Sequence, residues 1–224
     1  MMTSGNPDRL SALQRRILGC LADQEPRWTL LGGAALVGFH VDHRSTRDLD
    51  LFWRPLEELG EVVDEAEARL RSRGLMVSVI RRTPAFAQLR VADATDVVAV
   101  DLIAEPSVPV ADPEVVALGE TTIRVASRRE LLATKLCSLL HRSEVRDLQD
   151  VRELLLTGSS LDQGLADAPL VDAGFSTMTL AWLLESLDPV ALGAAADLTA
   201  DQAAALDAFR RELVARLVRL AKPA

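Results

Sequence analysis

The sequence predicts an α+β fold, in which a small mixed β-sheet flanked by helices is followed by a C-terminal helical region. Short alternating or β-branched runs, typical of strands, occur only within residues 1–126 and are interleaved there with helical periodicity. From residue 127 onward, apolar residues recur at helical spacing alone. We therefore expect a core with an N-terminal helix over 1–126 and a helical region over 127–224.

The first half offers elements in a clear order. Residues 8–23 repeat apolar side chains at helical spacing, and a strand at 27–31 runs into Gly32-Gly33 and a further helical stretch. Alternation predicts a strand at 47–53, and Pro55 opens an expected helix over about 56–72. Further strands are expected at 75–81, 85–92, 96–103 and 120–126, with a hairpin around 83–84.

The second half reads as a series of helices. The apolar run LLATKLCSLL predicts the first, and others are expected at about 144–157, 176–187 and 199–220, with shorter ones between them.

Composition and charge exclude several classes of protein. The 224 residues are 49% hydrophobic and 26% charged, which is ordinary for a soluble globular chain and excludes bulk disorder. No apolar run approaches the roughly 18–20 residues of a membrane span, and the N-terminus lacks the features of a signal peptide. We expect a cytoplasmic protein without membrane association.

The formal net charge of −8 is unevenly distributed. Residues 153–209 contain nine acids and neither lysine nor arginine, so the remainder of the chain is close to neutral. The net charge argues against a simple basic coat for nucleic acid, but it does not exclude a local groove that binds phosphate.

Asp48 and Asp50 give the clearest chemical signal. Residues i and i+2 of a strand point to the same face, so both carboxylates are expected side by side, with Leu49 and Leu51 buried opposite. Paired carboxylates suit a hard divalent cation. Taken alone, the pair is equally consistent with the solvated face of an edge strand.

A third carboxylate, Asp101, is the only charge in the run VVAVDLI. Such a run predicts a strand buried on both faces, where an unpaired carboxylate is costly. If this strand neighbours the first, three carboxylates could converge on a pair of metal ions. The alternative is an Asp that simply reaches solvent at a strand end.

Gly32 and Gly33 lie between a strand and a helix start. Glycines allow a ligand to approach the backbone closely, and a helix N-terminus presents N–H groups that suit phosphate. A Gly-Gly pair alone is weak, since most such pairs are only turns. The pair becomes a candidate for phosphate binding because it lies about 15 residues before Asp48.

Lys135 is conspicuous because only two of the 25 basic residues are lysines. It lies in an apolar helix with Arg142 on the same side, and Asp147 and Asp150 share a face of the next helix. Either aspartate could hold Lys135 or Arg142 in position. The plain alternative is a snorkelling surface lysine beside ordinary ion pairs.

Together, the strings "GGAAL…HRSTRDLDLF" and "K…L…HR…RDLQDV" resemble the nucleotidyltransferase superfamily and, more closely, the AbiEii-type toxins of type IV toxin–antitoxin systems, including MenT-like members. The motifs cover about residues 30–151. The resemblance implies an enzyme that transfers NMP from an NTP to an acceptor, tRNA or protein, and a cognate antitoxin as a partner.

The resemblance also implies roles for particular residues. Asp48, Asp50 and Asp101 would hold two Mg²⁺ ions, for which Mn²⁺ could substitute, and Asp101 would help to activate the acceptor hydroxyl. Gly32 and Gly33 would cradle the triphosphate. Many relatives carry Gly-Ser at that position, and Ser45 and Thr46 could supply the missing hydroxyl. The remaining implied residues, which serve phosphate charge and catalysis in the helical half, are Lys135, Arg142, Asp147 and Asp150.

Two other functions remain open from the residues alone. A glycosyltransferase with a DxD motif would bind a nucleotide sugar through a divalent ion, but it would leave Asp101 and the lysine helix unexplained. A non-catalytic module that binds a nucleotide or a partner would have little use for the intact carboxylates.

Overall fold

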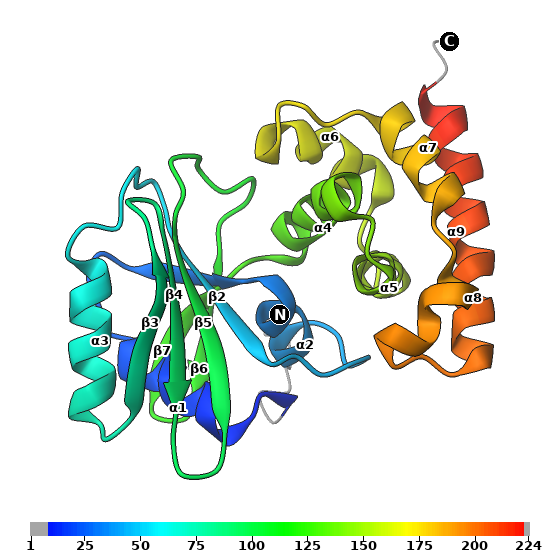
Figure 1. The fold of residues 1–224 in the computed structure, drawn as a ribbon. Helices are drawn as coiled ribbons and strands as arrows, with labels where there is room; N and C mark the ends of the chain where they lie inside the picture. Colours follow the sequence, from blue (N-terminus) through cyan, green and yellow to red (C-terminus); the bar gives the residue numbers. More distant parts are fainter. Residues whose placement is uncertain (1–8, 222–224) are drawn as a thin grey trace. The chain divides into compact units, whose positions relative to one another are not determined.

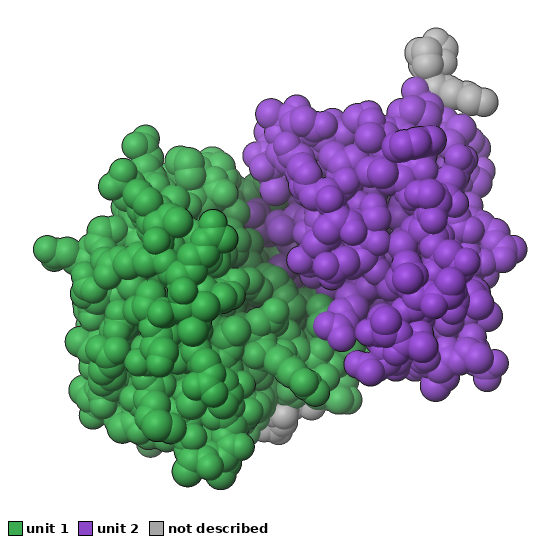
Figure 2. All heavy atoms as spheres, in the orientation of Figure 1, with its two compact units in different colours: residues 1–127 green, residues 128–224 purple. Residues whose placement is uncertain are grey.

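The computed structural model describes residues 9–221 of the chain. Contacts between residues divide the chain into two compact units, residues 1–127 and 128–224 (Figure 2). Each unit has its own hydrophobic core and its own set of secondary-structure elements, and the predicted mixed sheet flanked by helices is confirmed (Figure 1).

The first unit is built on one mixed sheet. Its described residues form seven strands in the order β3-β4-β5-β2-β1-β7-β6. The pairs β2–β5 and β1–β7 are parallel, and the other neighbours are antiparallel. The strands are β1 (Trp28–Leu31), β2 (Asp48–Trp53), β3 (Met76–Arg82), β4 (Phe86–Ala92), β5 (Val97–Ala104), β6 (Glu114–Leu118) and β7 (Thr121–Val125).

Among the described residues, three α-helices accompany this sheet: α1 (Ala12–Leu21), α2 (Gly32–Phe39) and α3 (Val62–Ser72). The helix α1 begins at a capping box, in which Ser11 and Gln14 exchange hydrogen bonds. The helix α3 begins later than Pro55 predicts. Gly60 has a φ of +52°, a left-handed conformation that interrupts helical backbone, and the helix starts only after it.

The strand β5 is buried on one face only, which corrects the expectation of burial on both. Val98, Val100 and Leu102 are buried, whereas the alternate positions Val97 and Ala99 are exposed. A helix layer therefore covers one side of this strand, and Asp101 lies on the open side, where its charge costs less.

The strand β6 was not expected from the sequence. It pairs with β7 through a tight turn at Gly119, whose φ is +61°. Its own sequence, EVVAL, has the β-branched content of a strand, but it follows a segment rich in proline that reads as a loop.

The first unit contains two tryptophans that face each other across the strands. Trp28 of β1 and Trp53 of β2 are paired in the antiparallel register, and both are buried. The indole nitrogen of each donates a hydrogen bond of 2.8 Å to a backbone carbonyl, of Leu21 and Pro26 respectively, so neither polar group is left unsatisfied.

The second unit is helical throughout. It contains α4 (Arg128–Arg142), α5 (Val145–Leu156), α6 (Leu161–Val171), α7 (Thr177–Ser186), α8 (Pro189–Leu192), the 3₁₀ helix η2 (Gly193–Ala196) and α9 (Ala200–Ala221). The helix α4 packs on α5 and α6, and α7 packs on α9 (Figure 1). At Gly164 a Cβ would lie 2.8 Å from Leu132, so the absence of a side chain lets α6 approach α4 closely.

Several acids of the segment 153–209 are paired with arginines of the same unit. Asp167 binds Arg129 of α4, and Asp207 binds Arg210 and Arg211 of α9. The segment that lacks basic residues is therefore partly neutralised by its neighbours. Within residues 9–221, no helix combines the length and the apolar character needed to cross a bilayer.

Candidate active site

Three predicted carboxylates lie on one face of the sheet in the first unit. Along β2 exposure alternates, so Asp48 and Asp50 face the open side while Leu49 and Leu51 are buried. Asp50 is the register partner of Asp101 on the parallel strand β5. Because paired residues of neighbouring strands point to the same side, the sheet itself gathers these acids.

The pKa of Asp101 is raised in this environment. Partial burial raises the pKa of Asp101, a hydrogen bond donated by the Gln88 side chain lowers it, and the negative charge of Asp48 raises it, with a net increase. The Gln88 Nε2 atom on β4 lies 2.9 Å from Asp101 Oδ1. The carboxylates of Asp48 and Asp101 therefore repel each other, and an amide fixes one oxygen of Asp101.

Gly32 lies directly against Asp50. A Cβ at position 32 would lie 1.8 Å from Asp50 Oδ2, and Gly32 has a φ of +63°. Only glycine satisfies both conditions, since a side chain would strain the backbone and collide with the carboxylate. The glycine motif and the acidic pair thus meet at one point of the first unit.

The strand β1 passes straight into α2, and Leu31 serves as the N-cap without a side-chain cap for the first amides. Gly33 occupies the first turn of this helix. A Cβ there would lie 2.9 Å from Thr46 Oγ1 and 3.1 Å from Arg44 Nη2, so two polar side chains reach the same bare stretch of backbone. This arrangement of amides, glycine and cationic side chain suits an anion.

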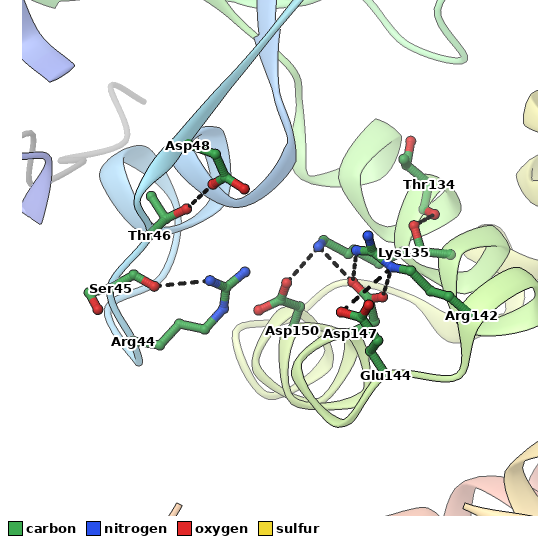
Figure 3. A network of polar contacts seen from close by, with 11 residues as sticks. Arg44, Ser45, Thr46, Asp48, Thr134, Lys135, Arg142, Glu144, Asp147 and Asp150 are labelled. Carbon is green, nitrogen blue, oxygen red and sulfur yellow. Dashed lines mark hydrogen bonds and ion pairs between the residues drawn. The ribbon is translucent and has the colours of Figure 1, made fainter. Parts of the chain in front are cut away.

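The loop before β2 is held from two sides (Figure 3). The Thr46 hydroxyl donates to Asp48 Oδ1, and the carbonyl of Ser45 accepts a 3.0 Å bond from Arg44 Nη1. The buried Gln14 side chain donates to the carbonyls of Thr46 and Asp48, at 3.3 and 3.2 Å. Thr46 thus lies beside the acids, whereas the Ser45 side chain is exposed.

The second unit contains the predicted lysine cluster. Lys135 Nζ lies 2.8 Å from Asp147 Oδ1 and 2.7 Å from Asp150 Oδ2, and these three residues are buried (Figure 3). Arg142 Nε binds Asp147 Oδ2 at 2.7 Å and lies 3.8 Å from Glu144. Both aspartates hold Lys135, so it is not a snorkelling surface lysine.

The charge of Lys135 is maintained by this geometry. Burial lowers the pKa of Lys135, but the attraction of Asp150 and Asp147 and their hydrogen bonds outweigh burial, so the pKa is raised overall. Lys135 therefore stays protonated at neutral pH, and its charge is balanced by the two aspartates.

The donor set of the first unit is compatible with a hard divalent ion. Asp48, Asp50 and Asp101 offer only carboxylate oxygens, the ligands that Mg²⁺ prefers, and the repulsion at Asp101 is of the kind that a cation relieves. In the part of the chain that the structure describes, no group of three His, Cys, Asp or Glu side chains forms a ready metal cluster.

Three residues near these groups were not singled out from the sequence: Gln14, Arg44 and Gln88. Gln14 belongs to an S-x-x-Q capping box, which predicts a helix start. The motif does not predict that the Gln14 side chain also binds the carbonyls of Thr46 and Asp48. Gln88 opposes Asp101 in an antiparallel register that only the strand pairing reveals.

The second unit also contains an open cavity of about 270 Å³. It is lined by residues of α4, α6 and the loop between α5 and α6, including Arg128, Ser159 and Gly164. None of the residues predicted for catalysis or nucleotide binding lines it.

Solved structures share this fold. MenT4, a nucleotidyltransferase toxin from Mycobacterium tuberculosis, superimposes with a TM-score of 0.57 at 21% identity over 94% of this chain and 91% of its own. JHP933 from Helicobacter pylori superimposes with a TM-score of 0.54 at 18% identity, over 93% of this chain and 91% of its own. The antibiotic-resistance factor ANT(2'')-Ia superimposes with a TM-score of 0.50 at 15% identity, over 73% of this chain and 94% of its own.

At these identities the structures show a common fold, and the family follows from the sequence. No curated protein matches the chain. The model of the family described as nucleotidyl transferase AbiEii toxin, type IV TA system, matches residues 16–218. That range contains both the glycine–aspartate motif and the lysine cluster, and the chain therefore belongs to the AbiEii family of nucleotidyltransferase toxins.

Proposed function

We propose that this protein transfers NMP from an NTP to a hydroxyl group of an acceptor, tRNA or protein, in a reaction that depends on Mg²⁺. The observation that carries this proposal is the contact between Gly32 and Asp50. It brings the start of α2, where Gly32 is half-buried and the first amides have no side-chain cap, against a carboxylate that suits a divalent ion.

The reaction is an in-line displacement. The acceptor oxygen bonds to the α-phosphorus, the bond from that phosphorus to the oxygen bridging the β-phosphate breaks, and pyrophosphate leaves with the bonding electrons. The acceptor hydroxyl loses its proton to solvent. Asp101, held by Gln88, orients that hydroxyl, and the amides at Gly32 and Gly33 bind the polyphosphate with help from Thr46 and, by a change of rotamer, Ser45.

Asp48, Asp50 and Asp101 would hold two Mg²⁺ ions, which Mn²⁺ could replace. When bound, the ions supply positive charge to the attacking and leaving oxygens. The rest of the work is positioning by residues of this chain, and the fixed register of β2 and β5 presets the spacing of the acids.

We assign the cluster of Lys135, Arg142, Asp147 and Asp150 to the same reaction. Its lysine is buried and protonated, and the two aspartates hold it in place. As a member of a toxin family of type IV systems, the protein would be counteracted by a cognate antitoxin.

The family favours nucleotidyl transfer over glycosyl transfer. A thermal-shift comparison separates the two, because a true ligand stabilises the folded protein. We expect Mg²⁺ with an NTP to raise the melting temperature more than Mg²⁺ with a nucleotide sugar does.

The central test uses the purified protein with each of the four NTPs, labelled at the α-phosphate, together with total tRNA or cell lysate. We expect label in an RNA or protein band on a gel, only when Mg²⁺ is present. Asp48→Asn should lower the rate by at least about 100-fold, since it removes a charge from the site.

Asp112→Asn is the matched control, because Asp112 is an exposed aspartate of the same unit. It should leave the rate unchanged. Equal labelling by the wild type and Asp48→Asn would refute the proposed mechanism, and the labelled band identifies the class of acceptor.

A further inference from the structure

Arg44 lies in the loop between α2 and β2 and is half-buried. Its guanidinium lies over the first turn of α2, with Nη2 at 3.1 Å and Nη1 at 3.5 Å from the point where a Cβ of residue 33 would lie. Gly33 has no side chain, so the arginine approaches bare backbone at the helix start.

Two features keep this loop in place. Gln14, which is only 1% exposed, donates hydrogen bonds to the carbonyls of Thr46 and Asp48, which follow Arg44 in the chain. The Arg44 head group itself donates to the carbonyl of Ser45 (Figure 3). The loop backbone is therefore fixed before any ligand arrives, which lowers the entropic cost of binding.

The chemistry of Arg44 differs from that of the acids beside it. A guanidinium presents five N–H donors in a planar fork that matches the oxygens of a phosphate. The amides at the start of α2 and Thr46 Oγ1 border the same space, and Asp50 adjoins it at Gly32. Cationic and amide donors thus lie next to the carboxylates that would hold metal ions.

From this geometry we propose that Arg44 binds the β- and γ-phosphates of the NTP, the part that leaves as pyrophosphate. The inference rests on the proposed nucleotidyl transfer and adds a residue that distinguishes a nucleoside triphosphate from a monophosphate. It predicts preference for NTP over NMP, with Arg44 as the source of much of that difference.

Binding measurements on the whole protein test this residue. Titration calorimetry in Mg²⁺ would use pyrophosphate, the four NTPs and the four NMPs as probes. For Arg44→Ala we expect dissociation constants of pyrophosphate and the preferred NTP to rise by at least about 10-fold, as for a lost charge-assisted hydrogen bond. The constant for the corresponding NMP should stay within about 2-fold.

Arg47→Ala is the matched control, because Arg47 is an exposed arginine of the same loop. It should bind all probes like the wild type. Arg44→Lys keeps the charge but loses the fork, so its constants should fall between those of the wild type and Arg44→Ala. Circular dichroism checks folding, and Arg44→Gln, which keeps most of the side chain, replaces Arg44→Ala if that variant is unfolded.

The outcomes separate the two proposals. If the wild type binds and transfers NTP while Arg44→Ala and Arg44→Gln bind pyrophosphate equally well, the role of Arg44 is refuted and the proposed function stands. Equal weakening by Arg47→Ala also refutes it, because general loop charge would then explain the effect. If the wild type neither binds nor transfers any NTP, the proposed function fails, and the role of Arg44 fails with it.

Discussion

At the residue scale, Gly32 carries two constraints at once. Its φ of +63° favours glycine, and its missing Cβ makes room for the Asp50 carboxylate. The first constraint concerns stability, while the second concerns the position of an acid that we assign to the reaction. Substitution at this residue should therefore affect both folding and activity.

Gly32→Ala should destabilise the fold and displace Asp50. A left-handed alanine costs about 1–2 kcal/mol, and the collision with the carboxylate adds about 1–3 kcal/mol. Because a misplaced group can cost 100-fold in rate, NMP transfer should fall by at least about that factor. Urea denaturation and the labelling assay measure the two effects.

Gly60→Ala provides the comparison, since Gly60 has a φ of +52° but nothing within 4 Å of its Cβ position. It should lose stability by about 1–2 kcal/mol and keep its activity. If both variants transfer NMP equally well, the contact between Gly32 and Asp50 has no functional meaning.

Residue patterns in the sequence predicted one part of the site well. Alternation places Asp48 and Asp50 on one face, and the structure confirms that arrangement. Arg44 and Gln14 escaped prediction because their contacts depend on how a loop folds back over a helix start, which no local periodicity encodes. An arginine four residues before an acidic strand was the available signal.

At the scale of elements, α4 and α5 are joined by a buried charge cluster. Lys135 is 5% exposed, and Asp147 and Asp150 are fully buried. Removing Lys135 takes from both buried aspartates the cation that they share, in a medium of low polarity. The cluster therefore supports the helix pair in addition to the role that we propose for it in the reaction.

Lys135→Met should lower the free energy of unfolding by about 3–5 kcal/mol, because it leaves the two aspartates without their shared cation. Urea denaturation followed by circular dichroism measures the change. Arg146→Met is the control on α5, since its side chain is 53% exposed and its contact with Asp197 is long, at 3.7 Å. That control should change stability by no more than about 0.5 kcal/mol, and an equally small change for Lys135→Met would exclude a structural role.

Strands and helices with strong local patterns were predictable, and the exceptions have physical causes. Single positions override local propensity, as Gly60 does at the start of α3. Burial of β5 on one face rather than two depends on which helices cover the sheet, which a single apolar run does not reveal. The strand β6 depends on its hairpin partner β7 and was missed for that reason.

At the scale of the whole molecule, the net charge of −8 conceals local pairing. The hydrogen bonds from Arg129 lower the pKa of Asp167, burial raises it, and Gln163 lowers it, with a net decrease from 3.8. The pKa of Asp207 is likewise lowered, by hydrogen bonds from Arg210 and Arg211. Acids with lowered pKa values stabilise the fold above their unfolded pKa, and this contribution is lost as the pH falls through the folded value.

Asp167→Asn should therefore weaken the dependence of stability on pH below about 4. The wild type should lose stability over this range more steeply than the variant, and the variant should be less stable at pH 7 by about 1–2 kcal/mol. Asp162→Asn, at an exposed pair with Arg216, should behave like the wild type within about 0.5 kcal/mol. Parallel pH profiles for wild type and Asp167→Asn would contradict the role of this pair.

The tryptophan pair between β1 and β2 has a spectroscopic consequence. The chain has no tyrosine and three tryptophans, so its intrinsic fluorescence comes from tryptophan alone. Trp28 and Trp53 are buried and will shift their emission to longer wavelengths when the first unit unfolds, whereas Trp182 of the second unit is already 68% exposed. Fluorescence thus reports the opening of the first unit and is nearly blind to the second, which must be followed by its helical circular dichroism.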